Sequence, residues 1–574
     1  MKFLYVLPLL CGLSTSTTAL DREAFTFTKY DLEVRVEADQ QRLAVRGKVT
    51  LRNDASTPQK NLSLQISSSL SWRSIQIDNK PIEFISQSYT SDIDHTGSLS
   101  EAIVTLPQEL SAGGKVELQI GYEGTIPLNT TRLTRIGVPD DVARKSDWDR
   151  IDGSFTAVRG IGFVTWYPVA MNVANLSENN NVAEIVSHWQ TQETQAEMNL
   201  KLRYSGVGNP QSLLCNGNET NQQNEELDRT FSVSVDCSFA PLGLTVPSFV
   251  ADQYERITGH LADIYAAPEH RSLGIDFTSA AENVTGFVHD WFGDPRGKII
   301  IAELPDVSAF PFASRNLLLT PFSKADPKQT ELTVVRQLTH ASFLSPRLWI
   351  SEGLTHFAQA LYREQQDGRF AALEFMKLHR QGMLAAEKID SSDDKEKVAR
   401  QNSLINTSIE ELYRGKAMYV WWMLRDMVGE PALKKALASY VPEQDNEPSY
   451  VQHLIEAQSK KDLEWFFDDW VYRDQGLPDL RVVSIYPRKN LKEGYLVTVL
   501  VENLGDAGVE VPVIVHHSGG EAVERLIVRG KSRASVRVSI ANLPEEVTLN
   551  DGTVPENDMS NNTFTYQPPP AENQ

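Results

Sequence analysis

The sequence predicts an α+β protein of several domains, with a β domain at each end and a mainly helical part between them. Apolar residues alternate over residues 30–51 with the period of two that a β-hairpin shows, and similar short runs recur up to about residue 245. Between residues 330 and 475 apolar residues recur at helical spacing, and beyond Pro478 the alternation returns. A chain of 574 residues is also too long for one hydrophobic core.

These changes of pattern set the expected boundaries. We expect a signal peptide over residues 1–19, an N-terminal antiparallel β domain over 20–250, a mainly helical domain over 251–477, a β-sandwich over 478–567 and a disordered tail over 568–574. No catalytic motif occurs in the first β domain. The chemistry is therefore expected in the helical domain.

The N-terminus has the pattern of a secretory signal peptide. Lys2 precedes an apolar run over residues 3–13, and small and polar residues then lead to Ala19. This run is too short to span a bilayer, and no later stretch reaches the roughly 20 apolar residues that a span requires. We therefore expect an exported protein, periplasmic or secreted, without a transmembrane anchor. Lipidation at Cys11 is the alternative, which the missing small residue before Cys11 disfavours.

The composition limits the class of partner. Hydrophobic residues make up 41% of the chain and charged residues 23%, as in an ordinary soluble protein. The formal net charge is −21, which opposes binding to nucleic-acid phosphates. We therefore expect no nucleic-acid partner. The acidity indicates nothing further, because a negative surface commonly serves solubility alone.

Two cysteines remain once the signal peptide is removed. In an oxidising compartment Cys215 and Cys237 are expected to form a disulfide that closes the polar segment between them. Two free thiols are the alternative.

A helix predicted over residues 332–343 carries the first candidate site residues. Arg336 and His340 are four residues apart, so they lie on one face of the helix, and Glu352 follows at the start of the next helix. Zinc peptidases use the motif His-Glu-x-x-His, in which two imidazoles bind the metal, the Glu is the general base and a later Glu is the third ligand. Without further context, His340 and Glu352 are an ordinary packing pair and a helix-start carboxylate.

Four stretches resemble the thermolysin-like zinc aminopeptidases, the family of membrane alanyl aminopeptidase, and the resemblance covers most of residues 25–475. Besides the helix just described, residues 351–357 read Ser-Glu-Gly-Leu-Thr-His-Phe and are similar to the segment that supplies the third zinc ligand. Residues 412–417 are similar to the family's Tyr-x-Lys-Gly-Ala, which implies that Tyr413 is the oxyanion-supporting position. Residues 463–470 resemble the end of the catalytic domain. The resemblance implies a thermolysin-like helical domain.

The departures from the family pattern affect the metal and the base. Arg336 stands where the first zinc-binding His is expected, and a guanidinium has no lone pair for a metal. Gln337 stands where the general base is expected, and an amide cannot take a proton from water as a carboxylate does. The stretch before Glu352 is also shorter than in the family. Residues 310–316, where the family binds the substrate's amino terminus, contain no carboxylate.

We therefore expect vestigial positions rather than a working centre. Gln337 and Tyr413 are the vestigial catalytic positions, and His340 and Glu352 are the vestigial metal positions. Arg336 is expected to occupy the place of the zinc and to pair with Glu352. This predicts a pseudopeptidase without a cofactor that binds peptides or proteins or serves as a scaffold.

The alternative is an active zinc aminopeptidase with an atypical site. In that case zinc is bound by His340, Glu352 and a replacement ligand, for which His356 is the candidate. A packed histidine is the simpler interpretation of His356.

The last β segment resembles bacterial immunoglobulin-like modules of the cell-adhesion type. It ends in an acidic, asparagine-rich turn that contains Asp551, Glu556, Asp558, Asn561 and Asn562. Calcium binding in this turn is left open, because acidic turns are more often merely solvated.

Overall fold

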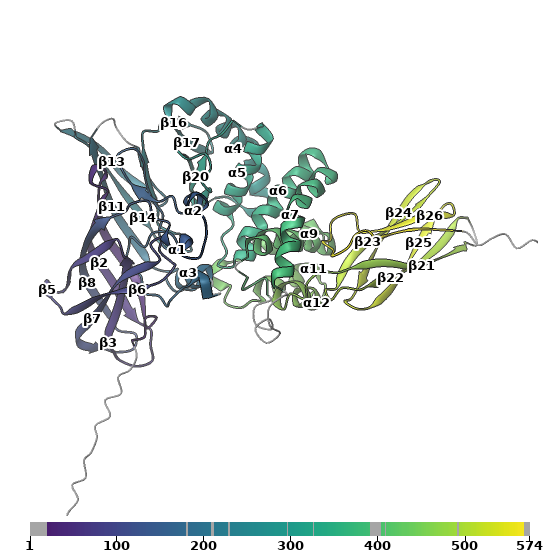
Figure 1. Cartoon of the computed structure of the whole chain (residues 1–574), viewed down its shortest axis with the longest axis horizontal. Helices are drawn as coiled ribbons and strands as arrows, with labels where there is room; N and C mark the ends of the chain where they lie inside the picture. The colour runs from purple at the N-terminus through teal and green to yellow at the C-terminus, as the bar shows by residue number, and fades with distance from the viewer. Residues whose placement is uncertain are drawn as a thin grey trace, which may run out of the picture.

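The computed structural model describes residues 20–178, 182–207, 212–227, 230–295, 297–324, 326–390, 403–407, 409–490 and 493–567. The predicted signal peptide and the predicted tail lie outside these residues. Three parts follow one another along the molecule, with β domains at the two ends and the helices between them (Figure 1). Among the described residues, no helix has the length and apolar character needed to cross a membrane.

The N-terminal part is built on an eight-stranded sheet in the order β13-β14-β11-β1-β2-β8-β4-β5. Its strands are β1 (Phe25–Glu37), β2 (Arg42–Asn53), β4 (Leu70–Ile77), β5 (Lys80–Pro81), β8 (Lys115–Thr125), β11 (Glu197–Val207), β13 (Asn218–Leu227) and β14 (Thr230–Phe239). The predicted hairpin is present, because β1 and β2 are antiparallel with Val34 opposite Val45. The alternating apolar residues of both strands are buried, as the period of two requires.

Among its described residues this part also has two smaller sheets and three α-helices. One sheet contains β3 (Gln59–Ser67), β7 (Ser98–Leu110) and β6 (Phe84–Thr90), and the other contains β12 (Ser212–Cys215), β15 (Phe249–Asp252), β10 (Thr156–Val158) and β9 (Arg150–Ile151). The helices are α1 (Thr131–Thr134), α2 (Asp140–Ser146) and α3 (Val182–Gln192). A disulfide joins Cys215 of β12 to Cys237 of β14, as predicted.

One strand pairing corrects the prediction of an antiparallel domain. β1 and β11 run parallel, with Leu32 opposite Leu200. Parallel neighbours need a long crossover rather than a hairpin, and strands β2 to β10 lie between these two in sequence.

The middle part joins a five-stranded mixed sheet to a set of helices. The sheet has the order β16 (Glu255–Thr258), β17 (Ala262–Ala266), β18 (Ile299–Leu304), β20 (Leu317–Pro321) and β19 (Phe312–Ser314). The helices are α4 (Arg271–Phe292), α5 (Pro327–Ser342), α6 (Leu348–Asp367), α7 (Arg369–Asp390), α9 (Ala417–Val428), α10 (Glu430–Ala438), α11 (Tyr450–Ser459) and α12 (Glu464–Phe467). Two π-helical segments, η4 (Glu411–Lys416) and η6 (Asp468–Tyr472), lie at the start of α9 and the end of α12.

Local sequence explains the ends of the two helices that carry the candidate site. The Asp326 side chain accepts a hydrogen bond from the Lys328 backbone N–H at 3.0 Å, and Pro327 occupies the first position of α5, which needs no donor there. α6 ends at Gly368, whose positive φ of 85° favours glycine. The core beside α6 contains Trp349, stacked on Trp421 with ring centroids 5.2 Å apart, and both rings are fully buried.

The C-terminal part is a second β domain of two sheets. One contains β21 (Leu480–Lys489), β22 (Tyr495–Asn503) and β25 (Arg533–Ile540), and the other contains β24 (Gly520–Val528), β23 (Val509–His517), β26 (Pro544–Leu549) and β27 (Thr563–Thr565). The domain contacts the helices through polar pairs. Trp470 donates through Nε1 to the Gly508 carbonyl at 2.7 Å, and Arg369 pairs with Asp551 at 3.1 Å.

Candidate functional site

The predicted site residues meet where α5 packs against α6. Half of the residues of α5 are buried, and Arg336 and His340 belong to its partly open stripe, with side chains 22% and 21% exposed. Glu352 lies on the second turn of α6, with 13% of its side chain exposed. The spacing of four residues on α5 places both basic side chains toward the same carboxylate.

The carboxylate of Glu352 accepts hydrogen bonds from three basic side chains. His340 Nε2 lies 2.8 Å from Oε1, Arg336 Nη2 lies 3.1 Å from Oε2, and Arg414 Nε lies 2.6 Å from Oε2. Both oxygens are therefore engaged by protein groups. The pairing of Arg336 with Glu352 that the sequence predicts is present. We refer to these four residues as the Glu352 cluster.

The charges of the cluster keep Glu352 ionised. Burial alone raises the pKa of the Glu352 carboxyl, but the charges of His340, Arg414 and Arg336 outweigh burial and hold its pKa well below the usual 4.5. Burial also disfavours the charged form of the Arg414 guanidinium and would lower its pKa. The Glu352 charge outweighs burial, so the pKa of Arg414 is raised.

The residues present do not fit a zinc centre of the peptidase type. Arg336 has no lone pair to donate, and both oxygens of Glu352 already accept hydrogen bonds from basic side chains. His356 does not complete the set, because it is buried and its Nδ1 lies 3.2 Å from the backbone carbonyl of Glu352. Within the described residues, no three His, Cys, Asp or Glu side chains are grouped so that they could hold a metal.

His356 lies in a strongly positive and dry environment. Burial, followed by the charge of Arg336, lowers the pKa of His356 to about 3. Its ring packs edge-on against His379, with centroids 5.2 Å apart. His356 is therefore a neutral, packed side chain at physiological pH, in agreement with the simpler interpretation of the sequence.

The two predicted catalytic positions lie beside the cluster and have different surroundings. Gln337 is 3% exposed, and neither atom of its amide has a hydrogen-bond partner among the described residues. Tyr413 lies on η4, where burial raises the pKa of its hydroxyl to about 12. The Arg414 guanidinium lies 5.7 Å from the centre of the Tyr413 ring. Tyr413 therefore stays protonated and able to donate a hydrogen bond at neutral pH.

Sequence reasoning gave no role to two residues of η4. Arg414 reaches Glu352 from the other side of the site, and Lys416 is fully buried between Glu387 and Asp474. Burial lowers the pKa of the Lys416 ammonium, but Asp474 and Glu387 outweigh burial and raise it. A charged residue inside an otherwise apolar helical run was the available signal, because such a residue is rarely buried without a partner.

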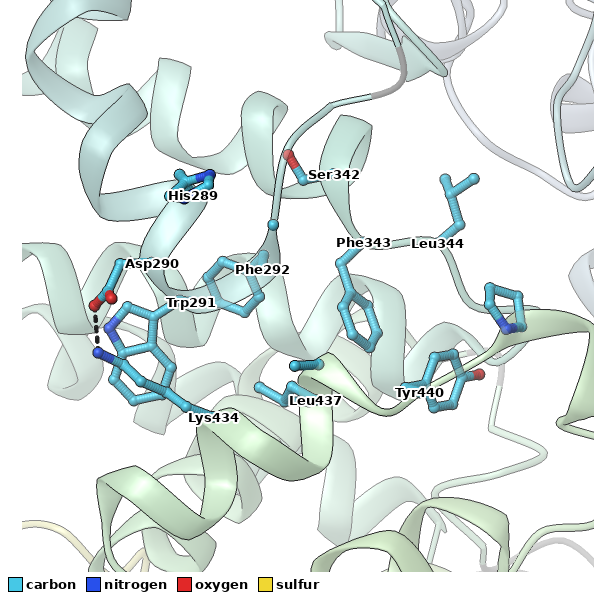
Figure 2. Close-up of a pocket in the computed structure, with 13 residues that line it drawn as sticks. His289, Asp290, Trp291, Phe292, Ser342, Phe343, Leu344, Lys434, Leu437 and Tyr440 are labelled. Carbon is cyan, nitrogen blue, oxygen red and sulfur yellow. Dashed lines mark hydrogen bonds and ion pairs between the residues drawn. The ribbon is translucent and has the colours of Figure 1, made fainter.

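A separate cavity of about 300 Å³, small by the standard of ligand pockets, lies at the ends of α4, α5 and α10. Figure 2 shows that the aromatic rings of Phe292 and Phe343 are among the side chains that line it. At one edge Lys434 pairs with Asp290 and lies 4.6 Å from the centre of the Trp291 ring. None of its lining residues belongs to the Glu352 cluster.

Comparisons with known proteins place this site within a peptidase fold. Residues 345–470 match the peptidase family M1 domain, which confirms the resemblance to the zinc aminopeptidases at the level of the family. The matched segment contains Glu352, Tyr413 and Arg414, whereas Arg336 and Gln337 lie before it. No curated protein sequence matches the chain.

Two solved structures have a similar fold. One is a mutant M1 zinc metallopeptidase from Deinococcus radiodurans bound to a Tyr-Ser-Ala substrate, with 16% identity and a TM-score of 0.50 over 80% of this chain and 96% of that chain. The other is aminopeptidase A from Legionella pneumophila in complex with aspartic acid, with 14% identity and a TM-score of 0.60 over 94% of this chain and 60% of that chain. At these identities the likeness is one of fold.

Proposed function

We propose that the protein is an exported pseudopeptidase. The premise is that the chain carries part of a peptidase family M1 domain in an aminopeptidase-like fold. In this proposal it binds peptides or proteins in the former catalytic region and does not hydrolyse them. The observation that carries the proposal is the engagement of Glu352 by Arg336, His340 and Arg414. The disulfide between Cys215 and Cys237 supports export, because such bonds persist in oxidising compartments.

The chemistry of hydrolysis lacks two of its parts. A general base typically contributes about 100-fold to 10,000-fold in rate, and the Gln337 amide cannot supply it. In zinc peptidases the metal lowers the pKa of its bound water to about 7, and none of the four residues of the Glu352 cluster can do so. Tyr413 can still donate a hydrogen bond, which serves ligand binding as well as catalysis. The immunoglobulin-like character of the C-terminal domain is part of the proposal and adds a surface for contacts or scaffolding.

The test combines metal analysis with hydrolysis. The full exported chain is purified without chelator, its zinc is measured by elemental analysis, and it is assayed against a panel of aminoacyl and peptide substrates. We expect no stoichiometric zinc and no turnover. One equivalent of zinc with turnover that a chelator abolishes would overturn the proposal in favour of the active zinc aminopeptidase.

A back-substituted variant makes the negative result informative. Arg336→His combined with Gln337→Glu restores two imidazoles and a carboxylate around Glu352, so we expect this variant to bind zinc. Arg347→His is the matched control, because Arg347 lies just before α6 and pairs with Asp445 outside the cluster. Zinc uptake by both variants alike would mean that the Glu352 cluster does not determine metal binding.

A further inference from the structure

Two neighbouring residues of α5 carry polar atoms without partners in the described part of the chain. Arg336 donates from Nη2 to Glu352, and its Nε is buried without a partner. Gln337 is nine-tenths buried or more, and both Oε1 and Nε2 lack partners. Buried polar atoms in folded proteins nearly always have a partner, so two adjacent side chains without one indicate that a further group completes the site.

The side chains that carry these atoms border the partly open stripe of α5, and the atoms themselves are covered in the unliganded protein. Arg336 and His340 form the partly open stripe of α5, and Gln337 is three residues before His340, so it borders that stripe. Arg414, 26% exposed, faces the same carboxylate from η4. Strand β19, the edge of the mixed sheet, packs beside α5.

The charge around these atoms favours an anion. Arg336, His340 and Arg414 share the carboxylate of Glu352, and the second carboxylate that pairs with Arg414, that of Glu410, is 59% exposed to solvent. The guanidinium charges extend to the neighbouring His356, where they act with burial to lower the pKa to about 3. Residues 310–316, which include β19, contain no carboxylate to pair with an amine.

We propose that this site recognises the C-terminal carboxylate of a peptide, a ligand chemistry opposite to the recognition of an amino terminus. The Arg336 and Arg414 guanidiniums bind the carboxylate, as planar donors do with two parallel hydrogen bonds. The Gln337 amide, with one acceptor and two donors, pairs with the last backbone amide of the peptide. The inference rests on the proposed function, because it assumes that the former catalytic region binds peptides.

Three peptide pools test the chemistry of the ligand. All are N-acetylated random hexapeptides: the first lacks Asp and Glu and has a free C-terminal carboxylate, the second is the same pool with a C-terminal amide, and the third is amidated but contains Asp and Glu. Retention by the full chain is measured by equilibrium dialysis and mass spectrometry. We expect the first pool to bind about tenfold to hundredfold more tightly than the second, the range for a lost charged hydrogen bond.

The other outcomes separate the two proposals. Equal retention of the first and second pools would overturn carboxylate recognition and leave peptide binding intact. Retention of the third pool equal to that of the first would assign the carboxylate to side chains and overturn recognition of the terminus. Retention of no pool would overturn the proposed function and this inference together.

Variants test the residues with a readout that a purely structural role does not give. Arg336→Gln is expected to remove most of the preference for the free carboxylate. Gln337→Leu is expected to weaken binding while it raises the thermal midpoint of the unliganded protein, because it removes an amide that is buried without partners. A fall of both binding and thermal midpoint would indicate that Gln337 serves only the fold and would overturn its role.

The matched control is Arg347→Gln. Arg347 is also a partly buried arginine of this domain, pairs with Asp445 at 2.8 Å, and lines a cavity between α3 and the start of α6. We expect this variant to keep the preference for the free carboxylate. Loss of the preference in Arg347→Gln but not in Arg336→Gln would place the carboxylate in that other cavity and overturn the inference.

Discussion

Two enclosed carboxylates of the chain are held by opposite kinds of partner. Glu352, in the helical domain, accepts hydrogen bonds from three basic side chains, at 2.6 to 3.1 Å. Glu556, in the C-terminal domain, is fully buried and accepts only from neutral donors. These donors are the Asn562 amide at 2.8 Å, the Asn550 amide, and the Leu480 backbone N–H at 2.9 Å.

The difference appears in the protonation of the two groups. Cations outweigh burial at Glu352 and hold its pKa well below 4.5, whereas at Glu556 burial outweighs the neutral hydrogen bonds and raises the pKa to about 7. Neutral donors thus provide hydrogen bonds to a buried carboxylate but do not offset the free-energy cost of burying its charge. Glu556 ties the acidic turn to the start of β21, and Arg380 of α7 donates to its backbone carbonyl at 2.7 Å.

The largest expected effect comes from removal of the charge of Glu352. In Glu352→Gln three basic side chains lose their counter-charge, so we expect the free energy of unfolding to fall by about 3 to 5 kcal/mol, the range for breaking a buried ion pair. Glu556→Gln is the matched control: it gives up neutral hydrogen bonds worth about 1 kcal/mol, but it also removes the cost of a buried carboxyl at pH 7, so we expect no loss of stability. Denaturant unfolding at pH 7 measures both. Equal losses in the two variants would show that the basic side chains of the Glu352 cluster are not destabilised when the charge of Glu352 is removed.

The next effect is a dependence on pH that comes from Glu556. The unfolded carboxyl has a pKa of 4.5 and the folded one about 7, so the unfolded chain releases its proton first as the pH rises. Glu556 therefore lowers stability progressively between these two pKa values, by about 3 kcal/mol in total. Glu352 has the opposite sign, because its contribution is present above pH 4.5 and is lost as the pH falls below that value.

The measurement is the difference in unfolding free energy between the parent and Glu556→Gln from pH 5 to pH 8. The parent should lose stability relative to the variant over this range. A constant difference would mean that Glu556 is ionised throughout, in spite of its burial.

Local sequence patterns predict much of the fold, but they do not predict the parallel pairing of β1 with β11. Alternation predicts the β1–β2 hairpin because both strands bury the same period of side chains and are adjacent in sequence. The pairing of β1 with β11 joins strands that are far apart in sequence, with Leu32 opposite Leu200. No local pattern distinguishes that neighbour from other apolar strands.

The candidate site shows the same limit. The spacing of four residues predicted that Arg336 and His340 share one helix face, and the family resemblance predicted the pairing of Arg336 with Glu352, but not the contact of His340 with the same carboxylate. Arg414 was missed because it reaches Glu352 from η4, a π-helical segment whose turns depart from the period of 3.6 residues. The missing partners of Gln337 depend on all the elements packed around it, which sequence periodicity does not describe.

The smallest effect separates Arg414 from the rest of the cluster. In Arg414→Gln the Glu352 charge keeps Arg336 and His340, so we expect a loss of about 2 kcal/mol, the value of one charged hydrogen bond, rather than that of the whole cluster. The pKa of His356 should also rise from about 3, because one of the charges that lower it is removed, and NMR titration measures this. Arg473→Gln is the control, since Arg473 is 66% exposed and pairs with Asp468 at the surface, where solvent screens the pair and a much smaller loss is expected. Equal small losses of unfolding free energy in the two variants, with no change in the pKa of His356, would mean that Arg414 contributes no more to stability than an exposed arginine. Arg336 and His340 alone would then account for the ionisation of Glu352.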